Sequence, residues 1–348
     1  MATRRYPKPT LDDVATLAGV SRATASRVLN GGVRSTASIH PDVRDAIFAA
    51  ARSLDYTANS QAQAMSAGAS STVAILVSEI DDPGSSALVS GALNRVRETG
   101  QALIVGLSGL TETDELDALR ALRGQRPKAV VIAVSRTTDT ARENAFREEL
   151  TAFADAGGRV SIIGANSFGF DEVLLRNADS AAALARALIE LGYRRFAIVT
   201  SSADQITSHE RQRGFMEEAA RAGLSIDPSL VVSADFDRDG GYVASGLLID
   251  RLDDIDLIFA ASDAMALGVI ARLRENGVSV PGDVAVAGFD DVPVVRDLTP
   301  PLTTVRIPLE EMASHAVDQV LDESGMGGPR TRELTGEVVV RASTPPNR

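Results

Sequence analysis

Short apolar runs and longer amphipathic segments alternate along most of the chain. From residue 73 onward, runs rich in Val, Ile, Leu and Ala are separated by segments in which apolar residues recur at helical spacing. Such runs are typical of buried strands in a parallel sheet, and the segments between them are typical of helices that cover the sheet. Strands are expected at 73–77, 102–107, 129–134, 160–163, 196–199, 257–260 and 284–287. The pattern predicts an α/β fold, and the length of this region indicates two parallel sheets.

The first 58 residues follow a helical pattern instead. Within 10–30, two short helical segments flank a turn at Gly19, whose lack of a Cβ suits a tight backbone. A third helix is expected to begin at Pro41, because proline favours the first helical position. The second segment exposes Arg22 and Arg27. An ordinary three-helix bundle would have the same spacing, but the two arginines favour a helix-turn-helix that places its second helix in the major groove of DNA.

A short segment connects these helices to the rest of the chain. Residues 59–65 have the pattern of a short helix, and residues 66–71 contain only Ser, Ala and Gly, as in a flexible connector. So short a helix is marginal by itself in water, and we expect it to fold only against a partner or DNA. We therefore expect a DNA-binding domain at 1–58, a hinge helix and linker at 59–72, and a core at 73–348.

Charge is divided unevenly between these parts. The chain has a net charge of −12, yet residues 1–70 hold eight Lys or Arg and five Asp or Glu, so this part carries +3 and the remainder carries −15. A basic head can engage phosphates while an acidic body stays away from the polyanion. An ordinary solvated surface could have the same small positive charge, so this observation supports DNA binding only weakly.

Composition restricts the chemistry that is available. The absence of Cys excludes disulfides and thiolate chemistry, and the three His, at 40, 209 and 315, are scattered. The chain lacks a P-loop, a GxGxxG fingerprint and a GxSxG nucleophile elbow. No signal-peptide pattern follows the basic N-terminal residues, and no apolar run approaches a membrane span. We therefore expect a cytoplasmic protein that is not an enzyme and has no cofactor, no metal and no membrane partner.

Several motifs occur together, in the order found in one family. They are Leu11-Asp12-Asp13-Val14-Ala15, Ala18-Gly19-Val20-Ser21 and Ser26-Arg27-Val28-Leu29-Asn30, then Leu191-Gly192-Tyr193-Arg194-Arg195, Arg211 with Gly214-Phe215, Ala261-Ser262-Asp263-Ala264-Met265-Ala266-Leu267-Gly268, Gly288-Phe289-Asp290-Asp291 and Pro301-Leu302-Thr303-Thr304. By these motifs the chain resembles the LacI/GalR family of bacterial repressors over nearly its whole length. The resemblance implies a sequence-specific transcriptional regulator whose two-lobed, periplasmic-binding-protein-like core holds a small-molecule effector.

The resemblance also implies which residues meet double-stranded operator DNA. Arg22 and Ala23 would contact base edges, and Arg27 would help to read or clamp the operator. The other positions are Ser21, Thr24 and Asn30, which would support phosphate contacts, and Asn59, Ala62 and Met65, which would lie on the hinge helix in the minor groove. Met65 stands where Leu is usual and would act as the apolar wedge. The loop at 31–38 is longer than is usual in the family.

In the family, crossovers join the two lobes, here expected near Asn177, Thr303 and Arg332. Lobe one is then expected at about 73–176 and 304–331, and lobe two at about 177–303 and 332–343. The effector would bind between the lobes, beyond the carboxyl ends of the strands. Core-to-core pairing, together with an operator of two half-sites, implies a homodimer.

Five residues match positions that contact effectors in the family: Ser78, Arg211, Phe236, Ser262 and Asp290. Arg211 and Asp290 would bracket hydroxyl groups, and Phe236 would lie against an apolar ring face. Structural alternatives exist, since Ser262 suits a helix N-cap, Asp290 suits its own turn, and Phe236 suits a core position. Arg211 has no obvious partner in the pattern, which favours a ligand-binding role for it.

Departures from the usual family residues leave the effector open. Gly164 and Arg176 stand where Asp is frequent, and Ser262 stands where Asn is usual. A sugar is the family default, but a site with few acceptors and aromatics would also suit a phosphorylated sugar, a nucleobase or another metabolite. The main alternative function is a solute-binding protein of the same fold, which the missing signal peptide and the added head disfavour. An enzyme is a more distant alternative.

Overall fold

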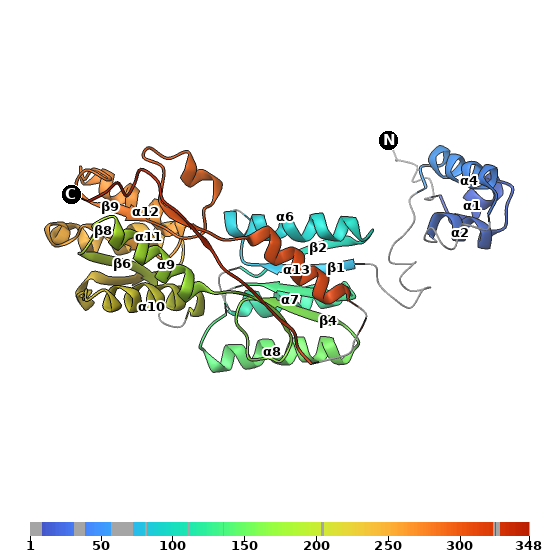
Figure 1. Cartoon of the computed structure of the whole chain (residues 1–348). Coiled ribbons are helices and arrows are strands. Elements are labelled where there is room, and N and C mark those ends of the chain that lie inside the picture. The colour runs from blue at the N-terminus through green and yellow to red at the C-terminus, as the bar shows by residue number, and fades with distance from the viewer. Residues whose placement is uncertain are drawn as a thin grey trace, which may run out of the picture. The chain divides into compact units, whose positions relative to one another are not determined.

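The computed structural model describes residues 9–30, 39–56, 72–80, 82–109, 112–134, 136–202, 205–322, 324 and 328–347. The chain forms two compact units, 1–71 and 72–348, which we call the head and the core (Figure 1). The predicted hinge positions Asn59, Ala62 and Met65 lie outside the described residues, as does the loop at 31–38. None of the described helices is both long enough and apolar enough to cross a membrane.

Three helices make up the described part of the head: α1 (Leu11–Leu17), α2 (Arg22–Asn30) and α4 (Pro41–Ser53). α1 begins with a capping box, in which the Thr10 hydroxyl accepts a hydrogen bond from the Asp13 N–H and the Asp13 carboxylate accepts one from the Thr10 N–H. Gly19, with φ +66°, makes the turn between α1 and α2. The small core contains Val14, Ala15, Ala25, Val28, Ile47, Ala50 and Ala51. The predicted three-helix head is confirmed.

The first lobe of the core is a parallel sheet with helices on both faces. Its strands are β1 (Thr72–Val77), β2 (Ala102–Leu107), β3 (Ala129–Ala133), β4 (Arg159–Ile163), β5 (Asp171–Leu175) and β11 (Thr331–Leu334), in the order β11-β5-β4-β3-β1-β2. Val73, Ile75 and Val77 of β1 pack on the side of α6 (Pro83–Glu98) and α13 (Leu309–Leu321). Ala74 and Leu76 pack on the side of α7 (Glu112–Gly124) and α8 (Thr140–Asp155). Because β1 is covered on both faces, it is apolar at every position after Thr72.

The second lobe repeats this arrangement with a four-stranded parallel sheet. Its strands are β6 (Phe196–Ser201), β7 (Val231–Ala234), β8 (Leu257–Ala260) and β9 (Ala285–Ala287), in the order β7-β6-β8-β9. Its helices are α9 (Asn177–Glu190), α10 (Ile206–Arg221), α11 (Arg238–Ser245) and α12 (Asp263–Glu275). The rings of Phe215 and Phe259 stack with their centroids 4.5 Å apart, and they join α10 to β8. The predicted α/β fold with two parallel sheets is confirmed.

Two glycines of the recognised motifs have a packing function. A Cβ added at Gly214 would lie 2.0 Å from the Ala178 carbonyl oxygen, and one added at Gly268 would lie 2.0 Å from the Arg238 carbonyl oxygen. Only glycine therefore allows α9 to approach α10, and α11 to approach α12, at these distances.

Three segments connect the lobes. The chain passes from β5 into α9, then back along β10 (Thr304–Arg306), and finally along β12 (Glu337–Val339), which pairs antiparallel with β10. The last of these segments runs across both lobes toward the C-terminus (Figure 1). β11 pairs with β5 in the first lobe through Leu334, so the third crossover follows Leu334 and not Arg332. A single buried apolar cluster extends from the first lobe into α9, α10 and the sheet of the second.

Candidate DNA-reading helix and ligand cleft

The outer face of α2 presents the residues predicted to read DNA. Ser21, Arg22, Ala23 and Arg27 are exposed, while Ala25 and Val28 of the same helix are buried. The Ser21 hydroxyl accepts a hydrogen bond of 3.1 Å from the Thr24 N–H, and the two hydroxyl oxygens lie 2.8 Å apart. Ser21 therefore fixes the start of α2, where backbone N–H groups suit a phosphate. The side chain of Asn30 is outside the described part of the chain.

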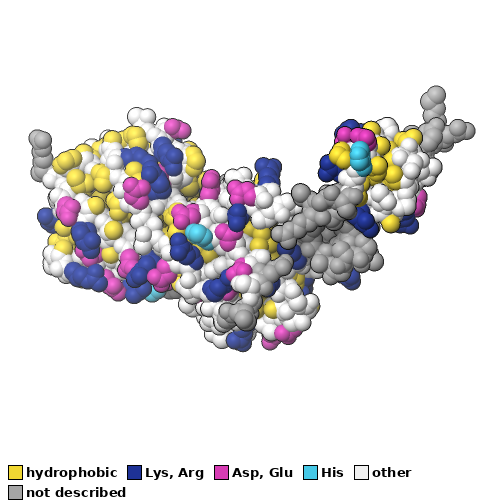
Figure 2. All heavy atoms as spheres, turned by 45° about the vertical axis from the view of Figure 1, so that its right-hand side comes forward, with side chains coloured by type: hydrophobic (Ala, Val, Ile, Leu, Met, Phe, Trp, Pro, Cys, Tyr) yellow, Lys and Arg dark blue, Asp and Glu magenta, His cyan; other side chains and the backbone are white. Residues whose placement is uncertain are grey.

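The two arginines of α2 are free to reach outward. Arg22 has only a loose ion pair with Asp12, at 3.5 Å, and both side chains are more than 60% exposed. Such an exposed pair is weak and can be exchanged for a contact with DNA. Basic and acidic side chains are mixed over the visible surface of the core (Figure 2). The head is therefore the part of the chain whose surface suits the DNA backbone and base edges.

A cavity of about 130 Å³ lies between the two lobes of the core. Its lining residues come from both lobes and from the crossovers: Leu88, Ala133, Val134, Arg136, Ile163, Gly164, Ala165, Leu175, Asn177, Ile206, Thr207, Glu210, Arg211, Ile307, Leu309 and Met312. Several of these residues directly follow the carboxyl ends of β3, β4 and β5. This is the position at which parallel α/β sheets bind ligands.

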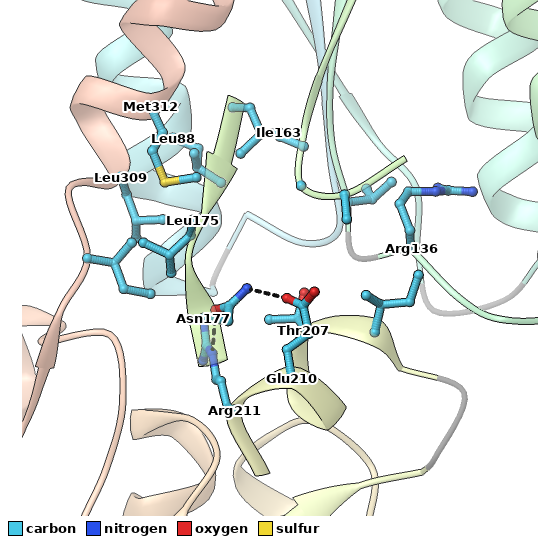
Figure 3. Close-up of a pocket in the computed structure, with 16 residues that line it drawn as sticks. Leu88, Arg136, Ile163, Leu175, Asn177, Thr207, Glu210, Arg211, Leu309 and Met312 are labelled. Atoms are coloured by element: carbon cyan, nitrogen blue, oxygen red, sulfur yellow. Dashed lines mark hydrogen bonds between the residues drawn. The ribbon is translucent and has the colours of Figure 1, made fainter. Parts of the chain in front are cut away.

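Arg211 is the centre of a buried polar cluster at one side of this cavity (Figure 3). It is 4% exposed, and its Nη1 lies 2.8 Å from the Ala261 carbonyl oxygen and 2.9 Å from Asp290 Oδ1. Its Nε donates to Asn177 Oδ1 at 3.1 Å, and its guanidinium lies 4.0 Å from the centre of the Phe289 ring. The expectation that Arg211 has no partner in the protein was wrong, because a buried cation needs hydrogen bonds and a counter-charge.

Asp290 and Asp291 extend the polar cluster from Arg211 to Arg306 on the crossover strand β10. Both have positive φ, +129° and +57°, which is a strained backbone conformation for residues other than Gly. Burial raises the pKa of Asp290 above its ordinary value, nearby Arg211 opposes this shift, and the negative charge of Asp263 adds to it. Asp291 is fully buried and forms ion pairs with Arg296, Arg306 and Arg341 at 2.6–3.1 Å.

The remaining predicted effector residues are distributed around this cluster. Phe236 is partly buried against the core of the second lobe, and its ring centre lies 6.0 Å from the Arg211 guanidinium. Ser262 directly follows Ala261, whose carbonyl binds Arg211. Ser78 lies in the first lobe at the end of β1, where its carbonyl accepts a hydrogen bond from Gly109. Of the five predicted effector residues, only Arg211 is among the residues that line the cavity. Phe236, Ser262 and Asp290 lie near Arg211 in the second lobe, and Ser78 lies apart from them in the first. The lining adds Asn177 and Glu210, which the sequence analysis did not predict as binding residues.

Ser262 has a structural function that can be measured separately. Its hydroxyl caps α12 by accepting a hydrogen bond of 3.2 Å from the Met265 N–H. We expect Ser262→Ala to lower the free energy of unfolding by about 1 kcal/mol, because the cap is lost. Ser262→Asn is the matched control and should keep most of the stability, since Asn is an equally good N-cap. Urea denaturation of both variants measures the difference, and equal stability of all three proteins would contradict the cap.

Comparison with known proteins supplies the family. Residues 10–59 match the family model "Bacterial regulatory proteins, lacI family", and residues 185–344 match "Periplasmic binding protein-like domain". The HTH-type transcriptional regulator CelR of Thermobifida fusca is 34% identical over 334 residues, which cover 92% of this chain and 94% of CelR. The chain belongs to the lacI family of bacterial regulatory proteins. GalR of Escherichia coli K12 is 30% identical to this lacI-family chain and covers 90% of it, with 88% of GalR aligned.

Solved structures agree with this membership. A CelR–cellobiose complex superimposes with a TM-score of 0.69 at 30% identity, over 96% of this chain and 99% of that one. The lac repressor dimer bound to operator superimposes with a TM-score of 0.80 at 21% identity, over 97% and 100%, and so shares the fold. Like its curated relatives, this lacI-family protein is a DNA-binding transcriptional regulator and not an enzyme. The match of its head to the family decides against a solute-binding protein.

Proposed function

We propose that this lacI-family regulator is a cytoplasmic repressor that binds operator DNA as a homodimer and changes its operator affinity when a small molecule, a sugar, occupies the cleft. The cavity between the lobes, with its buried cluster around Arg211, is the observation that carries the proposal. The related CelR, 30% identical in its solved structure, was obtained as a complex with cellobiose, which supports a sugar. Two heads suit an operator with two half-sites.

In this proposal the head reads the operator through the exposed face of α2. Arg22 and Ala23 contact base edges, and Arg27 reads or clamps the operator. Ser21, Thr24 and Asn30 bind phosphates, and Asn59, Ala62 and Met65 enter the minor groove from the hinge. The exposure of Arg22 and Arg27 and the hydrogen bond between Ser21 and Thr24 support these assignments for α2.

The core holds the effector through Ser78, Arg211, Phe236, Ser262 and Asp290. Arg211 and Asp290 turn toward the effector's hydroxyl groups, and Phe236 covers an apolar face of it. An effector that prefers one setting of the lobes shifts the balance between DNA-bound and free states, and DNA shifts effector affinity reciprocally. Asp291 supports this coupling, since its neighbour Asp290 pairs with Arg211, which lines the cavity, while Asp291 pairs with Arg306 of the crossover strand β10.

The reading of bases by Arg22 can be tested with one substitution. We expect Arg22→Ala to reduce the preference for the operator over single-base variants by about 1–3 kcal/mol, because a bidentate contact with a guanine edge is lost. Fluorescence anisotropy with the protein's own upstream DNA and its base variants measures this preference. Arg22→Lys is the matched control, because it keeps the positive charge but loses the two parallel donors of the guanidinium. It should therefore keep the salt dependence of DNA binding and lose the base preference. An unchanged preference in Arg22→Ala would remove Arg22 from the set of reading residues.

A further inference from the structure

The two sides of the cleft cavity differ in chemistry. The first lobe and the crossovers contribute a mostly apolar wall, with Leu88, Ile163, Leu175, Leu309 and Met312 (Figure 3). The second lobe contributes most of the polar residues, Asn177, Thr207, Glu210 and Arg211. Such a cavity suits a flat molecule with one apolar face and hydrogen-bonding groups on the other side.

The positive charges at the cavity are already neutralised. Arg136 is 3% exposed, with its Nη1 2.5 Å from Glu115 Oε1 and its Nη2 2.7 Å from Glu143 Oε1, and its guanidinium points away from the other lining residues (Figure 3). Arg211 is neutralised by Asp290 and also bonded to a backbone carbonyl. Neither arginine is therefore available to an anionic ligand without leaving a buried carboxylate unpaired, which is costly.

The carboxylate of Glu210 differs from these paired groups. It points into the cavity from the first turn and a half of α10 (Figure 3) and accepts one hydrogen bond of 3.0 Å, from Asn177 Nδ2. Among the described residues, no Lys, Arg or His lies within ion-pair distance of it. Asn177 in turn accepts from Arg211 through its Oδ1, so its amide is held in one orientation and fixes Glu210.

Other carboxylates make the surroundings more negative. Asp263 is fully buried at the start of α12, where it accepts hydrogen bonds from the Thr304 hydroxyl at 2.7 Å and the Val292 N–H at 2.9 Å. The negative charges of Asp263 and of Asp82, which caps α6 in the other lobe, both act on Asp290. These three carboxylates lie outside the cavity lining, so among the described lining residues Glu210 is the one carboxylate.

We infer that Glu210 determines ligand specificity, by accepting a hydroxyl of an uncharged sugar and excluding phosphorylated or carboxylated sugars. This inference rests on the proposed effector site. A hydroxyl that donates to a fixed carboxylate forms a charge-assisted hydrogen bond, whereas a phosphate at the same place meets a like charge that no cation offsets. The apolar wall opposite takes the C–H face of the sugar ring.

The test compares matched pairs of ligands on the full-length protein. Calorimetric titrations with cellobiose, glucose, galactose and ribose are paired with titrations of cellobiose 6′-phosphate, glucose 6-phosphate, galactose 6-phosphate and ribose 5-phosphate. We expect at least one neutral sugar to bind and its phosphate ester to bind at least about 100-fold more weakly. This ratio is measured on the unaltered protein and so does not depend on any variant folding.

The variant Glu210→Gln then tests whether this one side chain sets the ratio of affinities for the neutral sugar and its phosphate ester. Gln has nearly the same shape and can still accept from Asn177, so we expect the neutral sugar to lose about 10-fold in affinity and its phosphate ester to lose none. Glu217→Gln, on the exposed side of α10, is the matched control for the change in net charge and should keep the original ratio.

Each contrary result has a distinct meaning. If a phosphorylated sugar binds more tightly than its neutral parent and Arg211→Ala abolishes that binding, the effector site stands and the role of Glu210 is wrong. If the ratio is the same in Glu210→Gln as in the unaltered protein, Glu210 does not determine it. If neither class of sugar binds, the proposed sugar effector fails together with this inference.

Discussion

A core fragment that begins at Thr72 should lose sequence-specific DNA binding, by at least about a thousandfold in operator affinity. The exposed arginines of α2 are in the head, which has a hydrophobic core of its own. The core carries a net charge of −15, against +3 for residues 1–70, and its surface mixes acidic with basic side chains. Anisotropy titrations at two salt concentrations, with operator and scrambled DNA, measure the loss.

The fragment needs a control that keeps the chain intact. A full-length variant in which Arg22 and Arg27 are both Ala should lose most of the specific binding, because the helix remains but its reading and clamping groups do not. The fragment should still bind the effector, since the two lobes and their crossovers are complete from Thr72 onward. Operator binding by the fragment with the affinity of the whole chain would place the DNA-reading surface in the core.

The elements that could be predicted from the sequence are those in which nearly every residue is buried and therefore apolar. β1, β3 and β8 are covered on both faces, so their sequences are continuous apolar runs that the pattern detects. β5, β7, β10, β11 and β12 were not predicted, because each is only three to five residues long and all but β7 contain Asp, Glu, Arg or Thr. Their strand conformation depends on pairing with distant partners, β11 with β5 and β12 with β10.

The candidate site was predictable only in part, for a related reason. Resemblance to a family identifies Arg211 and Asp290 as residues, but it does not show that they bind each other across 79 positions of sequence. Asn177, which joins Arg211 to Glu210, was noticed only as a crossover. Glu210 gave no signal by itself, since a glutamate in the first turns of a helix is ordinary. The role proposed for it depends on the apolar wall opposite and on the lack of a cationic partner among the described residues.

Arg211→Ala should have the largest effect of any single substitution in the cleft. The guanidinium neutralises Asp290, which has a side chain only 20% exposed and lies near the buried Asp263. Removing one partner of a buried ion pair leaves the other charge buried and unpaired, so we expect the free energy of unfolding to fall by about 3–5 kcal/mol. We also expect effector binding to be lost, so that operator affinity becomes the same with and without the effector. Urea denaturation and anisotropy in the presence of the effector measure the two effects.

A double variant separates these two consequences. In Arg211→Met with Asp290→Asn, no charge is stranded and the apolar Met side chain can still lie against the Phe289 ring, so most of the lost stability should return. The effector response should not return, because the charged donors and the carboxylate that would hold hydroxyl groups are both gone. If the double variant is as unstable as Arg211→Ala, the stability comes from the bonds of Arg211 to Ala261 and Asn177 and not from its pairing with Asp290. If it responds to the effector like the unaltered protein, the ligand is held elsewhere, and the polar cluster around Arg211 serves only to join the second lobe to the crossovers.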